Sequence, residues 1–170
     1  MSIFQQVVST DGYLFAVTGP VIVGVWRQRA SQAGVDALLV MGAEMRKRYA
    51  HFGVIGIAEL HAPMPDGPVR RALGEALRAL RPQLAASSFL LVGDGFRAAT
   101  LRSVTTGLSL LFRESLPYHI DASTAGACAW LAQRLNPYLA VPLSPTVLAA
   151  DVERLRQSQL NVAVQMTGGR

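Results

Sequence analysis

Glycines follow one apolar segment in a spacing that suits the binding of an anion. Gly93, Gly95 and Ala98 form a Gly-x-Gly-x-x-Ala pattern there. A helix that begins at this turn would expose backbone amides, and such a helix N-terminus favours phosphate or another anion. Asp121 stands about 20 residues farther on, where a dinucleotide site places the acid that binds ribose. These residues indicate a site for a nucleotide or a small anion, although Asp94 inside the turn would repel phosphate.

Glu59 and His61 are the residues that could begin a metal or general-base site. They alternate by two, so at the end of a strand their side chains face the same side. Zinc and iron need three or four ligands, and no H-E-x-x-H pair or third ligand at a recognisable spacing accompanies them. The G-x-S-x-G elbow and the G-x-x-x-x-G-K-[ST] phosphate loop are also missing. We therefore expect no metal, cofactor or catalytic set, since an enzyme built on Glu59, His61 and Asp94 would require these side chains to converge.

A third candidate is a surface that binds a partner. Beyond Pro68, arginines occupy one sector of a predicted helix, next to its apolar sector. The loop before it, residues 61–68, contains three prolines, which lower the ordering cost of binding. The residues predicted to contact a partner are His61, Asp66, Arg70, Arg71, Arg78, Asp94 and Arg97. Nucleic acid is not favoured, because proteins that read single strands add stacking aromatic residues, and none interleave with these arginines.

Short apolar segments alternate with amphipathic ones, which predicts a layered α/β fold. Residues 13–17 and 21–26 predict an antiparallel hairpin, and the short apolar runs 52–58, 89–92 and 117–120 predict further strands. Helices are expected over residues 31–49, from residue 69 to Leu84, from 96 to 112, and from Ser123 to 135, with Ala125, Cys128, Leu131 and Leu135 pointing inward from the last. This alternation predicts a mostly parallel sheet with four main helices and one antiparallel edge strand from the hairpin.

The chain is expected to contain one domain and an extension. Residues 1–136 form the predicted α/β domain. Residues 137–170 hold a proline-rich connection and then a short amphipathic helix from near Ser144, with Val147, Leu148, Val152 and Leu155 on one side. Its last dozen residues are expected to fray.

The composition indicates a folded protein of the cytoplasm. Hydrophobic residues make up 51% of the chain and charged residues 16%, which is unlike a disordered segment. The sequence has neither a signal-like start nor about 18 consecutive apolar residues, so neither secretion nor a membrane span is expected. The net charge of +5 favours acidic partners. The single cysteine, Cys128, is predicted to be a buried structural thiol.

The order of these elements resembles the STAS superfamily of sulphate transporters and anti-sigma-factor antagonists, especially its stand-alone bacterial members. The resemblance spans residues 13–135 and depends on element order, on the Val21-to-Trp26 strand leading into a helix, and on Gly95-Phe96-Arg97-Ala98-Ala99 opening another. It implies a binding module that presents its helices and the loops at the carboxyl ends of its strands. Phosphorylated members carry an Asp-Ser-Ser-like turn, but residues 60–68 here contain neither serine nor threonine, so no phosphoserine switch is assigned.

These observations predict a non-catalytic regulatory or scaffolding module that binds a protein partner or a copy of itself. The alternative is a small-ligand sensor that uses Gly93, Gly95, Ala98 and Asp121 in the crevice at the carboxyl ends of the strands.

Overall fold

The computed structural model describes residues 4–60, 62–93 and 117–167, which form a layered α/β fold. Its sheet has six strands in the order in which they occur in the chain. These are β1 (Gln6–Ser9), β2 (Tyr13–Thr18), β3 (Val21–Trp26), β4 (Phe52–Ala58), β5 (Leu84–Leu91) and β6 (Tyr118–Asp121). β2 pairs antiparallel with β1 and β3, and β3 to β6 pair parallel. The predicted mixed, mostly parallel sheet is confirmed.

The helices begin close to where the sequence predicts them. Within the described residues they are α1 (Gln32–Arg48), α2 (Gly67–Leu80), α4 (Thr124–Leu135) and α5 (Pro145–Thr167), with a 3-10 turn η1 (Asn136–Tyr138) before α5. Ser31, Asp66 and Ser123 cap α1, α2 and α4 by accepting hydrogen bonds from backbone amides at 3.3, 2.9 and 3.0 Å. The predicted helix over residues 96–112 lies outside the described residues.

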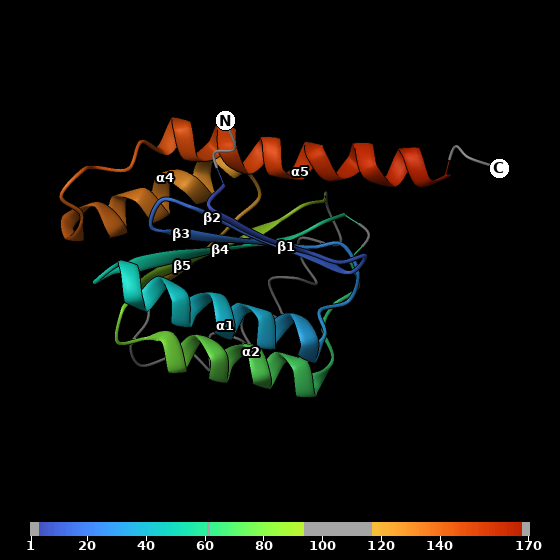
Figure 1. The fold of residues 1–170 in the computed structure, drawn as a ribbon, viewed down its shortest axis with the longest axis horizontal. Helices are drawn as coiled ribbons and strands as arrows, with labels where there is room; N and C mark the ends of the chain where they lie inside the picture. The colour runs from blue at the N-terminus through green and yellow to red at the C-terminus, as the bar shows by residue number, and fades with distance from the viewer. Residues whose placement is uncertain (1–3, 61, 94–116, 168–170) are drawn as a thin grey trace.

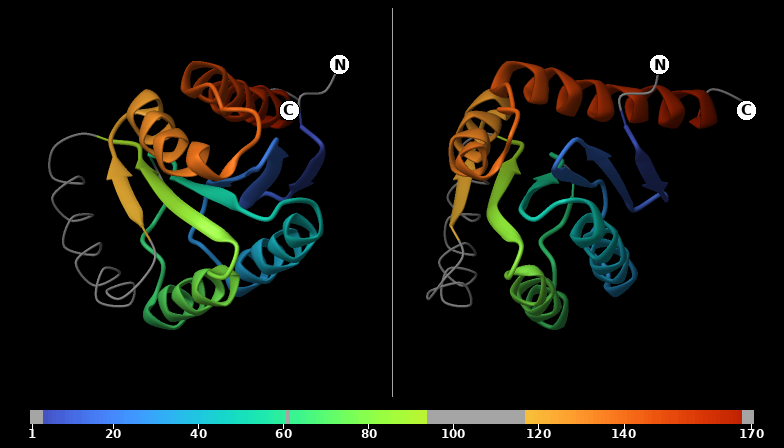
Figure 2. Two further views of the ribbon diagram at one scale, coloured as in Figure 1. Left: turned by 90° about the vertical axis from the view of Figure 1, so that its left-hand side faces the viewer. Right: turned by 60° about the vertical axis from the view of Figure 1, so that its left-hand side comes forward.

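Helices α1 and α2 cover one face of the sheet, and α4 and α5 cover the other (Figure 1 and Figure 2). The core therefore has two halves. Phe15 and Leu80 belong to the half under α1 and α2, and Leu14 and Leu131 belong to the half under α4 and α5. β4 is buried on both faces over nearly its whole length, which is why residues 52–58 form a continuous apolar run.

β1 is not among the strands that the sequence predicts. It has four residues, and the side chain of Val7 remains 51% exposed. Neither length nor apolar pattern therefore distinguishes this segment from a loop. Val7 lies opposite Ala16 of β2, so β1 forms the edge of the sheet and the predicted hairpin strand β2 lies inside it.

The second helix is shorter than predicted, and the strand after it is longer. α2 ends at Leu80, whereas the apolar spacing placed Leu84 on the helix. Leu84 instead begins β5, where it is buried opposite Phe52 of β4. The strand was missed before Phe89 because its first half consists largely of alanine and serine.

α4 is confirmed with one correction to its inward face. Cys128, Leu131 and Leu135 are fully buried, as predicted. Ala125 was predicted to point inward but is exposed, and Ala127 is buried in its place. Ala125 lies in the first turn of the helix, next to its cap. The apolar spacing therefore predicted as buried a residue that is exposed to solvent.

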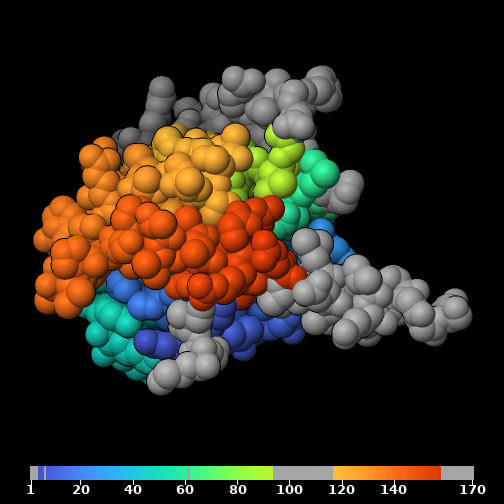
Figure 3. All heavy atoms as spheres, turned by 90° about the horizontal axis from the view of Figure 1, so that it is seen from above, coloured from blue at the N-terminus to red at the C-terminus, as the bar shows by residue number. Residues whose placement is uncertain are grey.

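α5 has 23 residues and is therefore not the short helix that the sequence predicts. Its Leu148, Val152 and Leu155 are buried in the core half that α4 covers, and the Thr18 hydroxyl donates to the buried carboxylate of Asp151 at 3.0 Å. Figure 3 looks onto this face, where α4 and the first half of α5 form a continuous surface. The extension thus packs on its own domain.

No described helix combines the length with the apolar character that a bilayer span requires.

Candidate binding surfaces

Glu59 follows β4 at the carboxyl edge of the parallel strands and is bound by an arginine of α5. Arg156 Nε donates to Glu59 Oε1 at 2.7 Å, and Arg156 Nη2 donates to Oε2 at 3.0 Å. This two-point geometry is the strongest form of arginine–carboxylate pairing. The hydrogen bonds that Arg156 donates to Glu59 raise the pKa of Arg156, although burial opposes the rise. Glu59 therefore serves as a cross-link between β4 and α5.

Arg156 also connects the two helices on that face. Its Nη1 donates to Glu153 Oε1 at 3.0 Å, and the hydroxyl of Thr124 in α4 donates to the same carboxylate oxygen. The network therefore fixes α5 against both β4 and α4. His61 and Asp94, which the enzyme hypothesis would bring to Glu59, lie outside the described residues.

Arg27 lies after β3 at the same edge of the sheet. Burial lowers the pKa of Arg27, and the carboxylates of Asp11 and Glu59 oppose that shift. Its Nη1 donates to the carbonyl of Thr10 at 3.4 Å, while Nε and Nη2 are buried without a hydrogen-bond partner among the described residues. The carboxyl edge thus contains two partly buried arginines around Glu59, an arrangement that the sequence spacing did not reveal.

The carboxylate of Asp121 is hydrogen-bonded to its own neighbours in the chain. Its Oδ1 accepts from the backbone amide and the hydroxyl of Ser123 at 2.8 and 3.0 Å, and Oδ2 lies 3.2 Å from Nε2 of His119. Burial alone would raise the pKa of Asp121, but the hydrogen bonds from Ser123 and His119 lower it below its ordinary value. Gly93 has φ 142°, a conformation that favours glycine, while Gly95 and Ala98 lie outside the described residues. The described residues therefore do not favour Asp121 as a ribose-binding acid.

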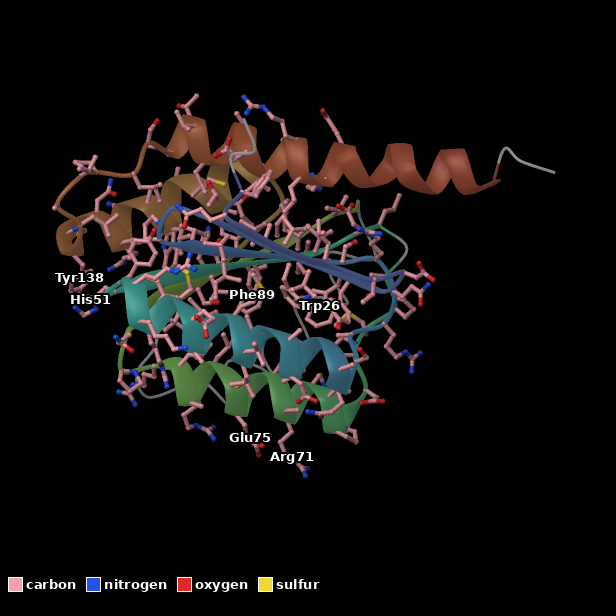
Figure 4. All side chains as sticks on the ribbon, in the orientation of Figure 1. Trp26, His51, Arg71, Glu75, Phe89 and Tyr138 are labelled. Carbon is pink, nitrogen blue, oxygen red and sulfur yellow. The ribbon has the colours of Figure 1, made fainter. Side chains whose placement is uncertain are left out.

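The predicted partner-binding residues of α2 divide into two groups. Arg71 and Arg78 are exposed, whereas Arg70 is half-buried. Figure 4 shows Arg71 and Glu75 projecting away from the sheet. Asp66 caps the helix, accepting from the amide of Val69 at 2.9 Å, so its carboxylate has a structural use. His61, Asp94 and Arg97 were also predicted to contact a partner and lie outside the described residues.

A small apolar cavity of about 40 Å³ lies between the sheet and helices α1 and α2. Trp26 and Phe89 line it, and Figure 4 shows them on this side of the sheet. Gly24 and Gly56 face each other across β3 and β4. A methyl group on Gly24 would come within 2.4 Å of the ring of Phe15, so the glycine is needed for the ring to pack there. The cavity is far smaller than the roughly 300–1,000 Å³ of typical ligand pockets.

The opposite edge of the sheet, where the parallel strands begin, carries residues that the sequence analysis did not select. The rings of His51 and Tyr138 lie 4.4 Å apart and join the start of β4 to η1 (Figure 4). A hollow of about 360 Å³ lies beside them, lined by Ala85, Pro117, Gln133, Arg134, Pro137 and Tyr138. The sequence shows arginines near the ends of α1, α2 and α4, but only the fold shows that these three helices end at the same edge of the sheet.

The described residues include no group of three or more His, Cys, Asp or Glu side chains placed to hold a metal ion. Burial, together with the charge of Glu153, raises the pKa of the Cys128 thiol to about 12.

Comparison with protein-family models, with curated proteins and with solved structures finds no match to this chain.

Proposed function

We propose that the protein is a STAS-like regulatory or scaffolding module of the bacterial cytoplasm that binds a protein partner, or a second copy of itself, without catalysing a reaction. The order of its elements supports the STAS-like assignment, because an antiparallel hairpin leads into alternating strands and helices. Such a module recognises its partner through exposed helix faces and loops.

The division of α2 into two faces is the observation that carries this proposal. Val69, Leu77 and Leu80 are buried against α1 and the sheet. Arg71 and Arg78 lie on the exposed side of the helix, where a partner can reach them. An exposed arginine contributes most to binding when a partner removes water from it and supplies a carboxylate.

A capture experiment tests this role of α2. Arg71→Glu and Arg78→Glu, separately and together, are expected to weaken retention of the native partner, with the partner identified by mass spectrometry and measured by its dissociation constant. Reversing a charge at an interface opposes the partner's carboxylates and typically weakens binding by tenfold or more per well-placed pair.

A matched control separates the surface from the net charge. Ala129→Glu combined with Gln157→Glu lowers the net charge by two, as a single arginine reversal does, and both sites are exposed on the opposite side of the sheet. This control is expected to retain the partner. Unchanged binding by the Arg71→Glu/Arg78→Glu variant would exclude α2 as the binding face.

A further inference from the structure

Three helices end at the edge of the sheet where the parallel strands begin, and all three ends carry cations. The left panel of Figure 2 looks onto this edge. The cations are Arg46, Lys47 and Arg48 of α1, Arg78 and Arg81 at the end of α2, and Arg134 at the end of α4. These six residues are called the basic edge below. Single cations at helix C-termini are favoured by the helix dipole, but the fold brings the ends of α1, α2 and α4 to one side.

Direct contacts make the basic edge continuous from one face of the sheet to the other. The guanidinium of Arg46 donates to the carbonyl of Ala79, which joins the ends of α1 and α2. Gln83 Nε2 donates to the carbonyl of Arg46 at 3.3 Å, tying the turn before β5 to α1. The packed rings of His51 and Tyr138 then connect the start of β4 to the segment after α4.

Among the residues that the structure describes, little negative charge balances these cations. Glu44 pairs with Lys47 at 2.7 Å. Arg48, Arg81 and Arg134 are exposed, and none of the three forms an ion pair within the described residues. Arg134 instead lies 5.5 Å from the ring centroid of Trp130. Exposed guanidinium groups without carboxylates create a positive potential that attracts an anionic partner.

The same edge offers a recess and an apolar contact beside the arginines. The hollow of about 360 Å³ is lined by Arg134, Gln133 and Tyr138 among others. The Tyr138 side chain is 55% exposed although its ring is held by His51. A peptide that crosses this edge can therefore place a carboxylate against Arg134 and an apolar side chain against Tyr138.

We propose that the basic edge binds an acidic segment of a partner protein. This proposal rests on the proposed function and names the chemistry of the partner. The occupant is not a second copy, because no two acidic residues are adjacent anywhere in the 170 residues, and the closest, Asp151 and Glu153, both belong to the ion pairs of α5. Nucleic acid is not favoured, since Tyr138 is the one exposed Phe, Tyr or Trp among the described residues and its ring already packs against His51.

Fluorescence anisotropy with two labelled peptides tests the proposal on the full chain. One peptide alternates glutamate with glycine and serine, and the other replaces each glutamate with glutamine. The protein is expected to bind the glutamate peptide at least tenfold more tightly than the glutamine peptide at low salt, and the difference should shrink as the salt concentration rises. Arg81→Glu combined with Arg134→Glu is expected to weaken binding of the glutamate peptide at least tenfold. The milder Arg81→Gln/Arg134→Gln variant should give a smaller loss in the same direction.

The matched control lowers the net charge by the same amount away from the basic edge. Arg29, Ala33 and Gln157 are exposed. Ala33 lies about 20 Å along the axis of α1 from Arg46, at 1.5 Å per residue. Arg29→Glu combined with Ala33→Glu and Gln157→Glu should therefore change binding of the glutamate peptide less than twofold. Circular dichroism is used to establish that every variant keeps the wild-type fold.

Three results would overturn the proposal. These are equal binding of the two peptides, an equal loss in the control and edge variants, and tighter binding of a single-stranded oligonucleotide of the same charge than of the glutamate peptide. The assay does not require the native partner and leaves Arg71 unchanged, so its failure is distinguishable from failure of the α2 capture experiment, which tests Arg71.

Discussion

Replacing Arg156 with methionine is expected to lower the free energy of unfolding by about 2 kcal/mol. Removing one partner of a fully buried ion pair costs about 3–5 kcal/mol, while an exposed pair contributes about 0–1 kcal/mol. The side chains of Arg156 and Glu59 are 19% and 28% exposed, so their pair lies between these limits. Methionine keeps much of the apolar stem of arginine, and the loss therefore reports mainly on the guanidinium contacts.

A double-mutant cycle measures the pair itself. Arg156→Met, Glu59→Gln and the double variant are unfolded in urea, and the free energies are compared. The coupling between the two residues is expected to be about 1–2 kcal/mol, because both hydrogen bonds are charge-assisted and together form a two-point pair. Part of the Arg156→Met effect will remain in the Glu59→Gln background, since Arg156 also donates to Glu153 at 3.0 Å.

The ion pair of Lys47 and Glu44 provides a control of equal length. It also measures 2.7 Å, but its side chains are 69% and 38% exposed. Lys47→Met is therefore expected to leave the free energy of unfolding nearly unchanged. If Arg156→Met costs no more than Lys47→Met, burial does not strengthen the Arg156 pair, and the claim that it fastens α5 to β4 is refuted.

Three further outcomes follow from the core and from the shifted pKa values. Leu131→Ala should lower the free energy of unfolding in urea by about 3 kcal/mol, because the side chain is fully buried between α4 and the sheet. Cys128, with its pKa raised to about 12, should react with a thiol reagent at pH 8 only as fast as the protein unfolds, and faster reaction in the native state would contradict its burial. Asp121 has a lowered pKa, so its contribution to stability is present above the ordinary value of 3.8 and is lost as the pH falls through the folded value. Asp121→Asn should therefore flatten the acid side of the stability profile, and an unchanged profile would contradict the shift.

Local patterns predict the elements whose burial is uniform along the chain. β4 is apolar throughout because α1 and α2 cover one face of the sheet and α4 and α5 the other, so a single property of the sequence identifies it. The caps Ser31 and Ser123 lie directly before the helices that they start. The start of β5 was missed because it consists largely of small residues up to Ser88, and the hydroxyls of the buried Ser87 and Ser88 have no hydrogen-bond partner among the described residues. Alanine and serine form no apolar run, so the sequence alone does not distinguish the start of this strand from the end of the preceding helix.

The candidate surfaces were harder to predict because they join distant parts of the chain. Glu59 and Arg156 are 97 residues apart, and only the packing of α5 across the sheet brings them into contact. His51 and Tyr138 meet for a similar reason, since η1 returns the chain to the start of β4. Sequence spacing identified Arg71 and Arg78 correctly as exposed, because both belong to one helix with a regular period.

The extent of the folding unit follows from what α5 buries. Leu148, Val152 and Leu155 are at most 3% exposed, and burying three such side chains contributes about 5–9 kcal/mol. This is comparable with the entire stability of about 5–15 kcal/mol that a domain typically has. Asn136 strengthens the connection, because its side chain donates to the carbonyl of Leu143 at 3.2 Å and accepts from its amide at 2.7 Å. We infer that the residue that ends α4 also fixes the path to α5, and that a chain ending after residue 136 would leave one face of its sheet too open to remain folded.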